Sequence, residues 1–154
     1  MSEHAGHDKV SLELMDGLVQ ASFTVIALLS QVATAHEMSL TQLRVLAILR
    51  DHEPKIAELA AHLGQERSSV SGLIDRSLRR GLVRRDRSDD DGRAVRVTLS
   101  EQGRAQVTAV TAEIADLVVP MAQRLTPDEQ KRLSALLGRL LDDGVGRVGA
   151  AGEG

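Results

Sequence analysis

The 154-residue sequence contains no cysteine, no tryptophan and no tyrosine, and Phe23 is its single aromatic residue. The absence of cysteine excludes disulfides, thiolate catalysis, zinc–thiolate sites and sensing through a thiol. With one aromatic side chain, the protein is not expected to offer stacking platforms to single-stranded nucleic acid or to sugars. The core must therefore be aliphatic, and 42% hydrophobic residues suffice for one substantial core.

Long apolar runs and catalytic motifs are also lacking. Uninterrupted apolar runs such as residues 25–29 are far shorter than the roughly 20 residues of a membrane span, and the first four residues lack the basic start of a signal peptide. The sequence has no glycine-rich phosphate loop, no nucleophile elbow and no HExxH motif. We therefore expect a soluble cytoplasmic protein without membrane association, enzymatic activity or a cofactor.

Two patterns could indicate a metal site, but neither has suitable spacing. If Gly92 is aligned with the sixth position of a calcium-binding loop, Arg87 and Thr98 occupy the first and twelfth positions, which need carboxylates. The histidines of the first three predicted helices have no partner four residues away, and exposed helix histidines are commoner than ligands. No metal site is expected.

The charge is unevenly distributed along the chain. The whole protein carries a net charge of -3, but residues 65–96 hold nine arginines against six acids. A basic segment in an acidic protein attracts phosphate locally, and arginine offers planar donors to phosphate oxygens and guanine edges. Charge alone leaves open a solvated surface balanced by its own acids.

Apolar residues at helical spacing predict three helices in the first 64 residues. The first is long, from about residue 12 to residue 32. Residues 39–42 have the pattern of a capping box and open a second helix, which stops before Pro54. A short third helix over residues 56–63 is closed by Gly64, because glycine tolerates the left-handed conformation of a helix C-cap.

A fourth helix has an apolar stripe and an unusual polar side. Its stripe consists of Val70, Leu73, Ile74 and Leu78. The polar side opens with small hydroxyl residues, so the helix backbone can approach another molecule closely. Gly81 is expected to end this helix.

The alternation of apolar residues then predicts a hairpin. Leu82 and Val83 begin one strand, and Val95, Val97 and Leu99 alternate with polar residues in a second. Residues 88–92 between them are rich in turn formers and include Asp-Gly, the strongest hairpin signal. The result is a two-stranded hairpin with a charged tip.

Two further helices complete the chain. Ser100 caps a fifth helix with apolar residues at steps of three and four, and Pro120 is expected to kink or shorten it. Thr126, Pro127 and Glu129 open a sixth helix that carries a leucine stripe. Residues 144–154, rich in glycine and small residues, are expected to form a disordered tail.

The terminal helices carry more apolar surface than one small winged core could cover. We expect this surface to pack against a second copy, with a self-contained helical sheath as the alternative. The predicted fold is mainly α with a small β-hairpin wing. Residues 8–36 and 100–143 would form a dimerisation domain, and residues 37–99 a winged helix-turn-helix domain.

The third and fourth helices fit a helix-turn-helix, whose second helix enters the major groove of duplex DNA. Small hydroxyl residues at the entering end can bond phosphates while a long arginine reaches base edges. The residues at that end are Arg67, Ser68, Ser69 and Ser71. The hairpin would act as a wing that places an arginine in the neighbouring minor groove.

These residues carry a resemblance to the MarR (multiple antibiotic resistance regulator) family. The motifs that carry the resemblance are the runs 59–63 and 68–71, Arg76, the run 80–85, the wing Asp91-Gly92-Arg93-Ala94 and the run 97–103. The resemblance covers about residues 12–141 and implies a triangular dimer with intertwined terminal helices. It also implies that Arg93 enters the minor groove, that Asp91 orients it, and that Arg76 and Arg84 clamp the DNA backbone.

Two features depart from the family pattern. The third helix has no Ser or Thr cap after Pro54, which leaves its start uncertain. The wing tip carries three successive aspartates, so Asp89 and Asp90 either pair with Arg85 and Arg87 or weaken DNA affinity.

The sequence also allows other interpretations of the site residues. Ser68, Ser69 and Ser71 could cap and solvate a helix start. Arg79 and Arg80 could complement the dipole of their helix rather than contact phosphate. Arg93 could be an ordinary exposed arginine.

The sequence therefore predicts a homodimeric regulator of transcription, a repressor by family habit, that binds an inverted repeat in double-stranded DNA. The resemblance implies release by a small aromatic or anionic effector, bound between the dimerisation helices and the winged lobe near His36, Met38 and Arg50. The alternative is a helical dimeric protein-interaction module that does not bind DNA.

Overall fold

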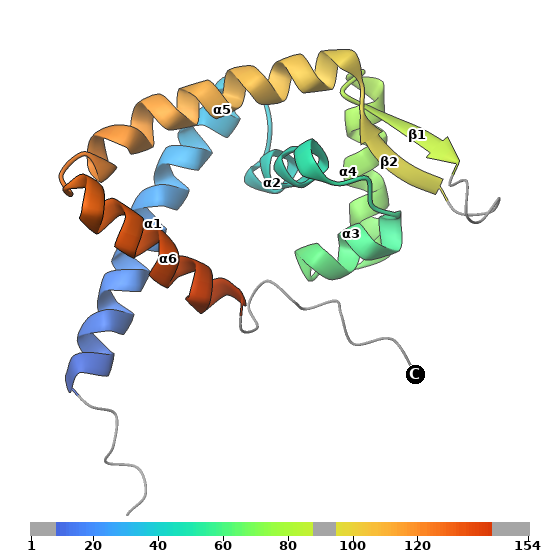
Figure 1. Cartoon of the computed structure of the whole chain (residues 1–154). Helices are drawn as coiled ribbons and strands as arrows, with labels where there is room; N and C mark the ends of the chain where they lie inside the picture. The colour runs from blue at the N-terminus through green and yellow to red at the C-terminus, as the bar shows by residue number, and fades with distance from the viewer. Residues whose placement is uncertain (1–8, 88–94, 143–154) are drawn as a thin grey trace, which may run out of the picture.

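The computed structural model describes residues 9–87 and 95–142. In chain order the elements are α1 (Lys9–Ala35), α2 (Leu40–Asp51), α3 (Ile56–Leu63), α4 (Arg67–Arg79), β1 (Val83–Arg87), β2 (Val95–Leu99), α5 (Glu101–Ala122) and α6 (Pro127–Asp142). This is the expected order, mainly helical with one antiparallel hairpin. Figure 1 shows α5 extending from a winged lobe, formed by α2, α3, α4, β1 and β2, to the region of α1 and α6. The predicted tail and wing tip lie outside the described residues.

Capping interactions confirm most of the predicted helix boundaries. The Ser39 hydroxyl accepts from the Gln42 amide at 3.1 Å, and Gly64 closes α3 with a positive φ of 64°. The Ser100 hydroxyl accepts from the Gly103 amide at 2.9 Å. In the box at α6, the Thr126 amide donates to Glu129 at 2.8 Å and lowers the pKa of that carboxyl.

One helix boundary differs from the sequence interpretation, and the start of α3 agrees with it. Helix α5 continues through Pro120 to Ala122, so the proline lies in the last turn and does not end the helix before it. Helix α3 begins at Ile56 as predicted, without a hydroxyl cap. The Lys55 amide donates to the Glu58 carboxylate at 3.3 Å, and tertiary pairing also holds the preceding chain: the Val97 amide donates to the Pro54 carbonyl at 2.9 Å, and Lys55 forms an isolated bridge with Arg96.

The core is aliphatic, as composition required. Its most completely buried side chains come from the three helices and strand β2 of the winged lobe: Leu46, Leu59, Ile74, Leu99, Val45, Val70 and Val97. The end of α1 and the first half of α5 pack onto this cluster through Val32 and Val107. Phe23, by contrast, is 65% exposed. The winged lobe therefore has its own core, to which the terminal helices are attached at one end.

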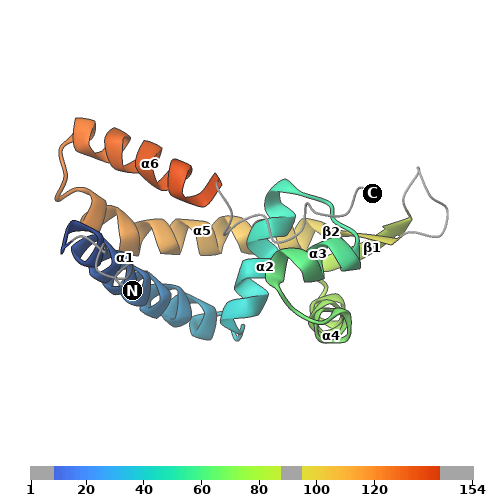
Figure 2. The ribbon, with the colours of Figure 1, turned by 90° about the horizontal axis from the view of Figure 1, so that it is seen from below.

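A large apolar surface on the terminal helices has no cover within the described chain. On α1 it includes Leu14, Met15 and Phe23. On α6 it consists of Leu133, Leu136, Leu137, Leu140 and Leu141, and no described side chain of α6 is buried. Figure 2 shows α6 set apart from the winged lobe. Contiguous apolar surface of this kind marks an interaction site.

The segments Leu12–Ala35 and Glu101–Ala122 are long and apolar enough to cross a membrane, by length and composition only. The short apolar runs of the sequence led us to expect no such segment, but mean hydropathy over a whole helix also counts apolar residues separated by polar ones. The core helices of soluble proteins pass the same test, so it is weak evidence for a membrane span.

Helix α1 ends in a Schellman motif that has a glutamate where glycine is usual. The Met38 amide donates to the Ala33 carbonyl at 2.8 Å and the Glu37 amide to the Thr34 carbonyl at 3.0 Å. Glu37 therefore has a φ of 55°, a left-handed conformation that is unfavourable for a residue with a Cβ atom.

We predict that Glu37→Gly stabilises the protein by about 0.5 to 1 kcal/mol, because relief of this strain outweighs the added freedom of the unfolded chain. Thermal unfolding should show a midpoint raised by roughly 2–4 °C. The control Ala35→Gly places the same residue inside the last helical turn and should lower the midpoint. A lower midpoint for Glu37→Gly would contradict this prediction.

Candidate nucleic-acid interface

Helices α3 and α4 form the helix-turn-helix, and α4 presents a polar side to solvent. Its inner side is fixed by Val70 and Ile74, both fully buried. Arg67, Ser68 and Ser69 are exposed at the start of the helix. Glu66 occupies the N-cap without a side-chain cap bond, so the serines lie inside the helix and do not cap it. The first turn therefore offers an arginine and two hydroxyls to a partner.

A polar hollow of about 530 Å³ lies between the beginnings of α2 and α4. It brings Arg76 together with Ser68 and Ser69, three residues that the sequence assigned to DNA binding. Ser39 and Thr41 line its other side. Sequence reasoning missed these two because Ser39 was accounted for by its capping role, and only the tertiary structure places the start of α2 beside α4.

The wing is anchored to α4 at its base. In the β1–β2 register Arg84 lies opposite Thr98, and Arg85 opposite Val97. The Arg85 guanidinium bonds the Asp75 carboxylate of α4 at 2.6 Å. Arg85 thus has a partner that the sequence did not suggest; the alternatives there were that Asp89 and Asp90 pair with Arg85 and Arg87 or that they weaken DNA affinity.

The Arg84 guanidinium is exposed and lies 3.9 Å from the Asp86 carboxylate, which accepts from the Thr98 hydroxyl at 2.9 Å. An exposed pair at this distance holds the arginine weakly, so Arg84 stays available to a phosphate. Asp89, Asp90, Asp91 and Arg93 lie outside the described residues.

Arg80 has a role other than the two that the sequence suggested, which were phosphate contact and interaction with the dipole of its own helix. Its guanidinium donates to the backbone carbonyl of His36 at 2.9 Å and to that of Glu37 at 3.0 Å. These carbonyls belong to the chain between α1 and α2, neither to its own helix nor to a ligand. Arg79 next to it is exposed.

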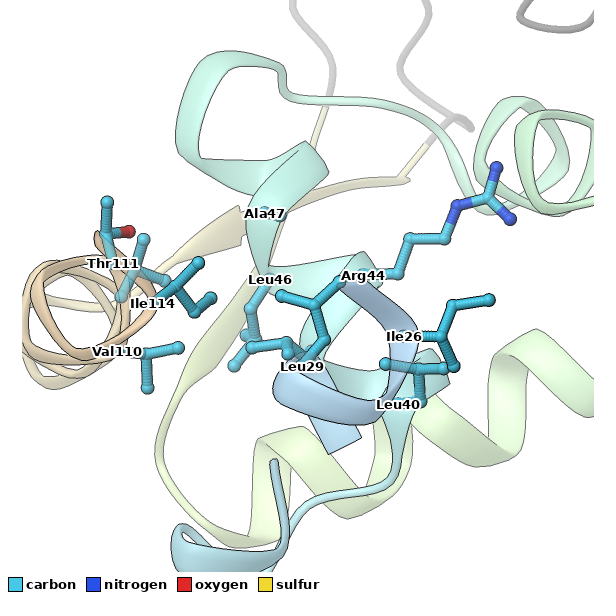
Figure 3. Close-up of a pocket in the computed structure, with 11 residues that line it drawn as sticks. Ile26, Leu29, Leu40, Arg44, Leu46, Ala47, Val110, Thr111 and Ile114 are labelled. Atoms are coloured by element: carbon cyan, nitrogen blue, oxygen red, sulfur yellow. The ribbon is translucent and has the colours of Figure 1, made fainter. Parts of the chain in front are cut away.

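A second hollow is apolar and lies between α1, α2 and α5, with a volume of about 410 Å³ (Figure 3). Thr111 and Arg44 are the two lining side chains that are not aliphatic. The aliphatic lining consists of Ile26, Leu29, Leu40, Leu43, Leu46, Ala47, Val107, Val110 and Ile114. Arg44 supplies the only charge, and Figure 3 shows it extending away from the α5 residues.

The three residues expected at an effector site do not line this hollow. Met38 is buried in the core, and the His36 ring contacts Gln106 and Glu113. Arg50 bonds Asp51 at 2.7 Å, which raises the pKa of Arg50 and lowers that of Asp51. In residues 9–87 and 95–142, no three His, Asp or Glu side chains gather where they could hold a metal ion.

Comparison with known proteins identifies this architecture. The family model described as MarR family matches residues 36–94. The chain is 36% identical over 69 residues to the uncharacterized HTH-type transcriptional regulator YfiV of Bacillus subtilis, a match covering 44% of this chain and 43% of YfiV. It is 28% identical to the HTH-type transcriptional regulator MgrA of Staphylococcus aureus, over 73% of this chain and 76% of MgrA.

Solved structures agree with the sequence matches. RV1404 from Mycobacterium tuberculosis aligns with a TM-score of 0.73 and 26% identity, over 89% of this chain and 95% of that one. Two neighbours under 25% identical share the fold: NadR in complex with 4-hydroxyphenylacetate (TM-score 0.72) and a Staphylococcus aureus MepR mutant bound to an oligodeoxyribonucleotide (TM-score 0.59). Sequence motifs, fold and relatives together make this chain similar to the MarR family of winged helix-turn-helix transcriptional regulators.

Proposed function

We propose that the protein is a cytoplasmic homodimer that binds an inverted-repeat operator in double-stranded DNA and represses transcription from it. The observation that carries this proposal is the exposed side of α4. Within the described residues, neither the Arg67 nor the Arg76 guanidinium has a hydrogen-bond or ion-pair partner; Arg67 precedes Ser68 in the helix, and Arg76 lines the polar hollow with Ser68 and Ser69. A helix of this kind can enter the major groove and bond phosphates at its edges.

In this proposal helix α4 and the wing contact adjacent grooves of the DNA. Arg67, Ser68, Ser69 and Ser71 approach the major groove, and Arg76 and Arg84 bind the DNA backbone. Arg93 enters the minor groove beside it, oriented by Asp91. The oligodeoxyribonucleotide bound to the MepR mutant supports DNA as the partner of this fold.

The homodimer follows from the uncovered apolar surface of the terminal helices. Residues 8–36 and 100–143 would form the dimerisation domain, and residues 37–99 the DNA-binding domain. Two copies related by a twofold axis bury the same surface on each partner. They present two copies of α4 to half-sites one helical turn apart, so the operator has the symmetry of the protein.

Release by a small molecule is the second part of the proposal. The apolar hollow beside α2 has space for a compact apolar or aromatic ligand, and Arg44 at its border can pair with an anionic group. The aromatic acid bound to NadR supports this class of ligand. Such a ligand lowers DNA affinity only by as much as it prefers the spacing of the two α4 helices that does not bind.

Selection of bound duplexes from a random pool, followed by a salt titration, tests the proposal. We expect an inverted repeat, and a linear decrease of log affinity with log salt concentration. The slope should be about -0.9 for each phosphate neutralised, with about 6 to 10 phosphates for a dimer. A protein-interaction module without DNA binding would instead bind no duplex from the pool, even at low salt concentration.

We predict that Arg93→Ala weakens binding to the selected duplex by about 1 to 3 kcal/mol, because a minor-groove contact is lost from each half of the dimer. Gel-shift or anisotropy titration measures the change. The control Arg124→Ala removes an exposed arginine from the turn between α5 and α6, far from the wing, and should bind like the wild type. Unchanged affinity of Arg93→Ala would remove the wing arginine from the interface.

A further inference from the structure

The chain between α1 and α2 is a junction where three parts of the protein meet. It is the direct connection from the first terminal helix to the winged lobe. The Schellman motif at its start holds His36 and Glu37 in a fixed, strained turn. The carbonyls of both residues therefore point in defined directions rather than into a mobile loop.

Arg80 connects this junction to the end of α4. Helix α4 packs chiefly on α3 and β1, which belong to the same lobe. The Arg80 guanidinium extends beyond that packing and donates to two successive carbonyls, at 2.9 and 3.0 Å. A planar guanidinium with two bonds restricts orientation as well as distance, which a single bond does not.

Helix α5 is attached to the same junction. The His36 ring lies 2.9 Å from the Glu113 carboxylate and 2.5 Å from the Gln106 side-chain nitrogen. The base of α5 also meets the chain that follows Arg80, where the Ser100 hydroxyl donates to the Gly81 carbonyl. One turn of chain thus holds the end of the DNA-reading helix and two of the proposed dimerisation helices.

We propose that Arg80 is the positioning residue that sets the angle of α4 relative to the dimerisation helices, and thereby makes operator affinity depend on half-site spacing. This inference rests on the proposed dimeric DNA binding. Without the two bonds, the winged lobe can pivot about its connections at residues 36–39 and 99–101. The two α4 helices of a dimer then sample several separations, and the protein distinguishes half-site spacings less sharply.

The test uses the selected inverted repeat and two derivatives in which the spacer is one base pair longer or shorter, a displacement of roughly 3.4 Å along the axis. We expect the wild type to lose roughly 10-fold in affinity on each derivative. Arg80→Met should reduce that penalty about fivefold, near the lower end of coupling between distant sites. A mere loss of folding would weaken binding to all three duplexes equally and leave the ratio of their affinities unchanged.

Two further variants separate positioning from charge. Arg79→Met removes the neighbouring exposed arginine and should keep the wild-type spacing ratio, even if overall affinity falls. Arg80→Lys keeps the charge but cannot form the planar pair of bonds, so we expect a reduced spacing penalty; it also decides the matter if Arg80→Met does not fold. A wild-type ratio in folded Arg80 variants that bind DNA would overturn this inference alone. Failure of the wild type to bind any duplex would overturn the proposed function and this inference with it.

Discussion

Leu140→Glu is expected to separate the dimer and to lower operator affinity by about 100-fold or more. Leu140 lies on the leucine surface of α6 and is 47% exposed in the single chain. In a symmetric dimer one substitution places two carboxylates in the same apolar interface, and an unpaired charge there is strongly unfavourable. A monomer binds one half-site at a time, so it loses the gain from simultaneous binding, typically 10²- to 10⁴-fold.

Sedimentation equilibrium and titration of the selected duplex measure the two effects of Leu140→Glu. Ala135→Glu is the matched control, since it adds the same charge to the opposite side of α6 and should remain dimeric. If Leu140→Glu stays dimeric at micromolar concentration, α6 does not contribute to the interface as we propose. If it becomes monomeric and keeps its operator affinity, the symmetric mode of binding is wrong.

Gly103→Ala is expected to destabilise the protein by about 3 kcal/mol, the upper part of the usual range for overpacked sites. A Cβ atom at Gly103 would lie 1.9 Å from the Leu82 carbonyl oxygen, and that oxygen accepts from the Ser100 amide at 3.0 Å. The Leu82 carbonyl and the Ser100 amide both belong to the backbone, so neither can move without breaking the connection between the winged lobe and α5.

Thermal unfolding should show the effect of Gly103→Ala as a decrease of roughly 10 °C in the midpoint. Gly72→Ala is the control, because a Cβ atom at Gly72 meets nothing within 4 Å. That substitution inside α4 should stabilise the protein by about 0.5 to 1 kcal/mol. A wild-type midpoint for Gly103→Ala would show that the join can relax more than its geometry suggests.

Much of the fold could be predicted from local signals because those signals act over a few residues. The capping boxes at Ser39 and Thr126 and the glycine after α3 define helix ends through contacts within one turn. Pro120 shows the limit of the approach: a proline disfavours helix, but its effect depends on where in the helix it falls. The chain before α3 also pairs with β2, more than 40 residues away, and no local signal carries that information.

The candidate site divides in the same way. The arginine and serines at the start of α4 could be assigned from spacing, because periodicity alone separates the buried stripe from the exposed side. The roles of Arg80 and Arg85 could not be assigned, since their partners are backbone carbonyls of His36 and Glu37 in one case and Asp75 in the other. A backbone carbonyl is present at every residue, so the sequence holds no sign of which one an arginine will meet.

By itself, the sequence determined a helical protein with an aliphatic core and a hairpin. It also showed which side of α4 faces outward, because hydrophobic periodicity and capping are local properties. Only the tertiary structure decided which elements meet: α2 beside α4 at the polar hollow, α1 and α5 around the apolar one, and the Arg80 side chain on the turn after α1. Those contacts join distant parts of the chain, and their geometry is set by how the helices pack rather than by any residue alone.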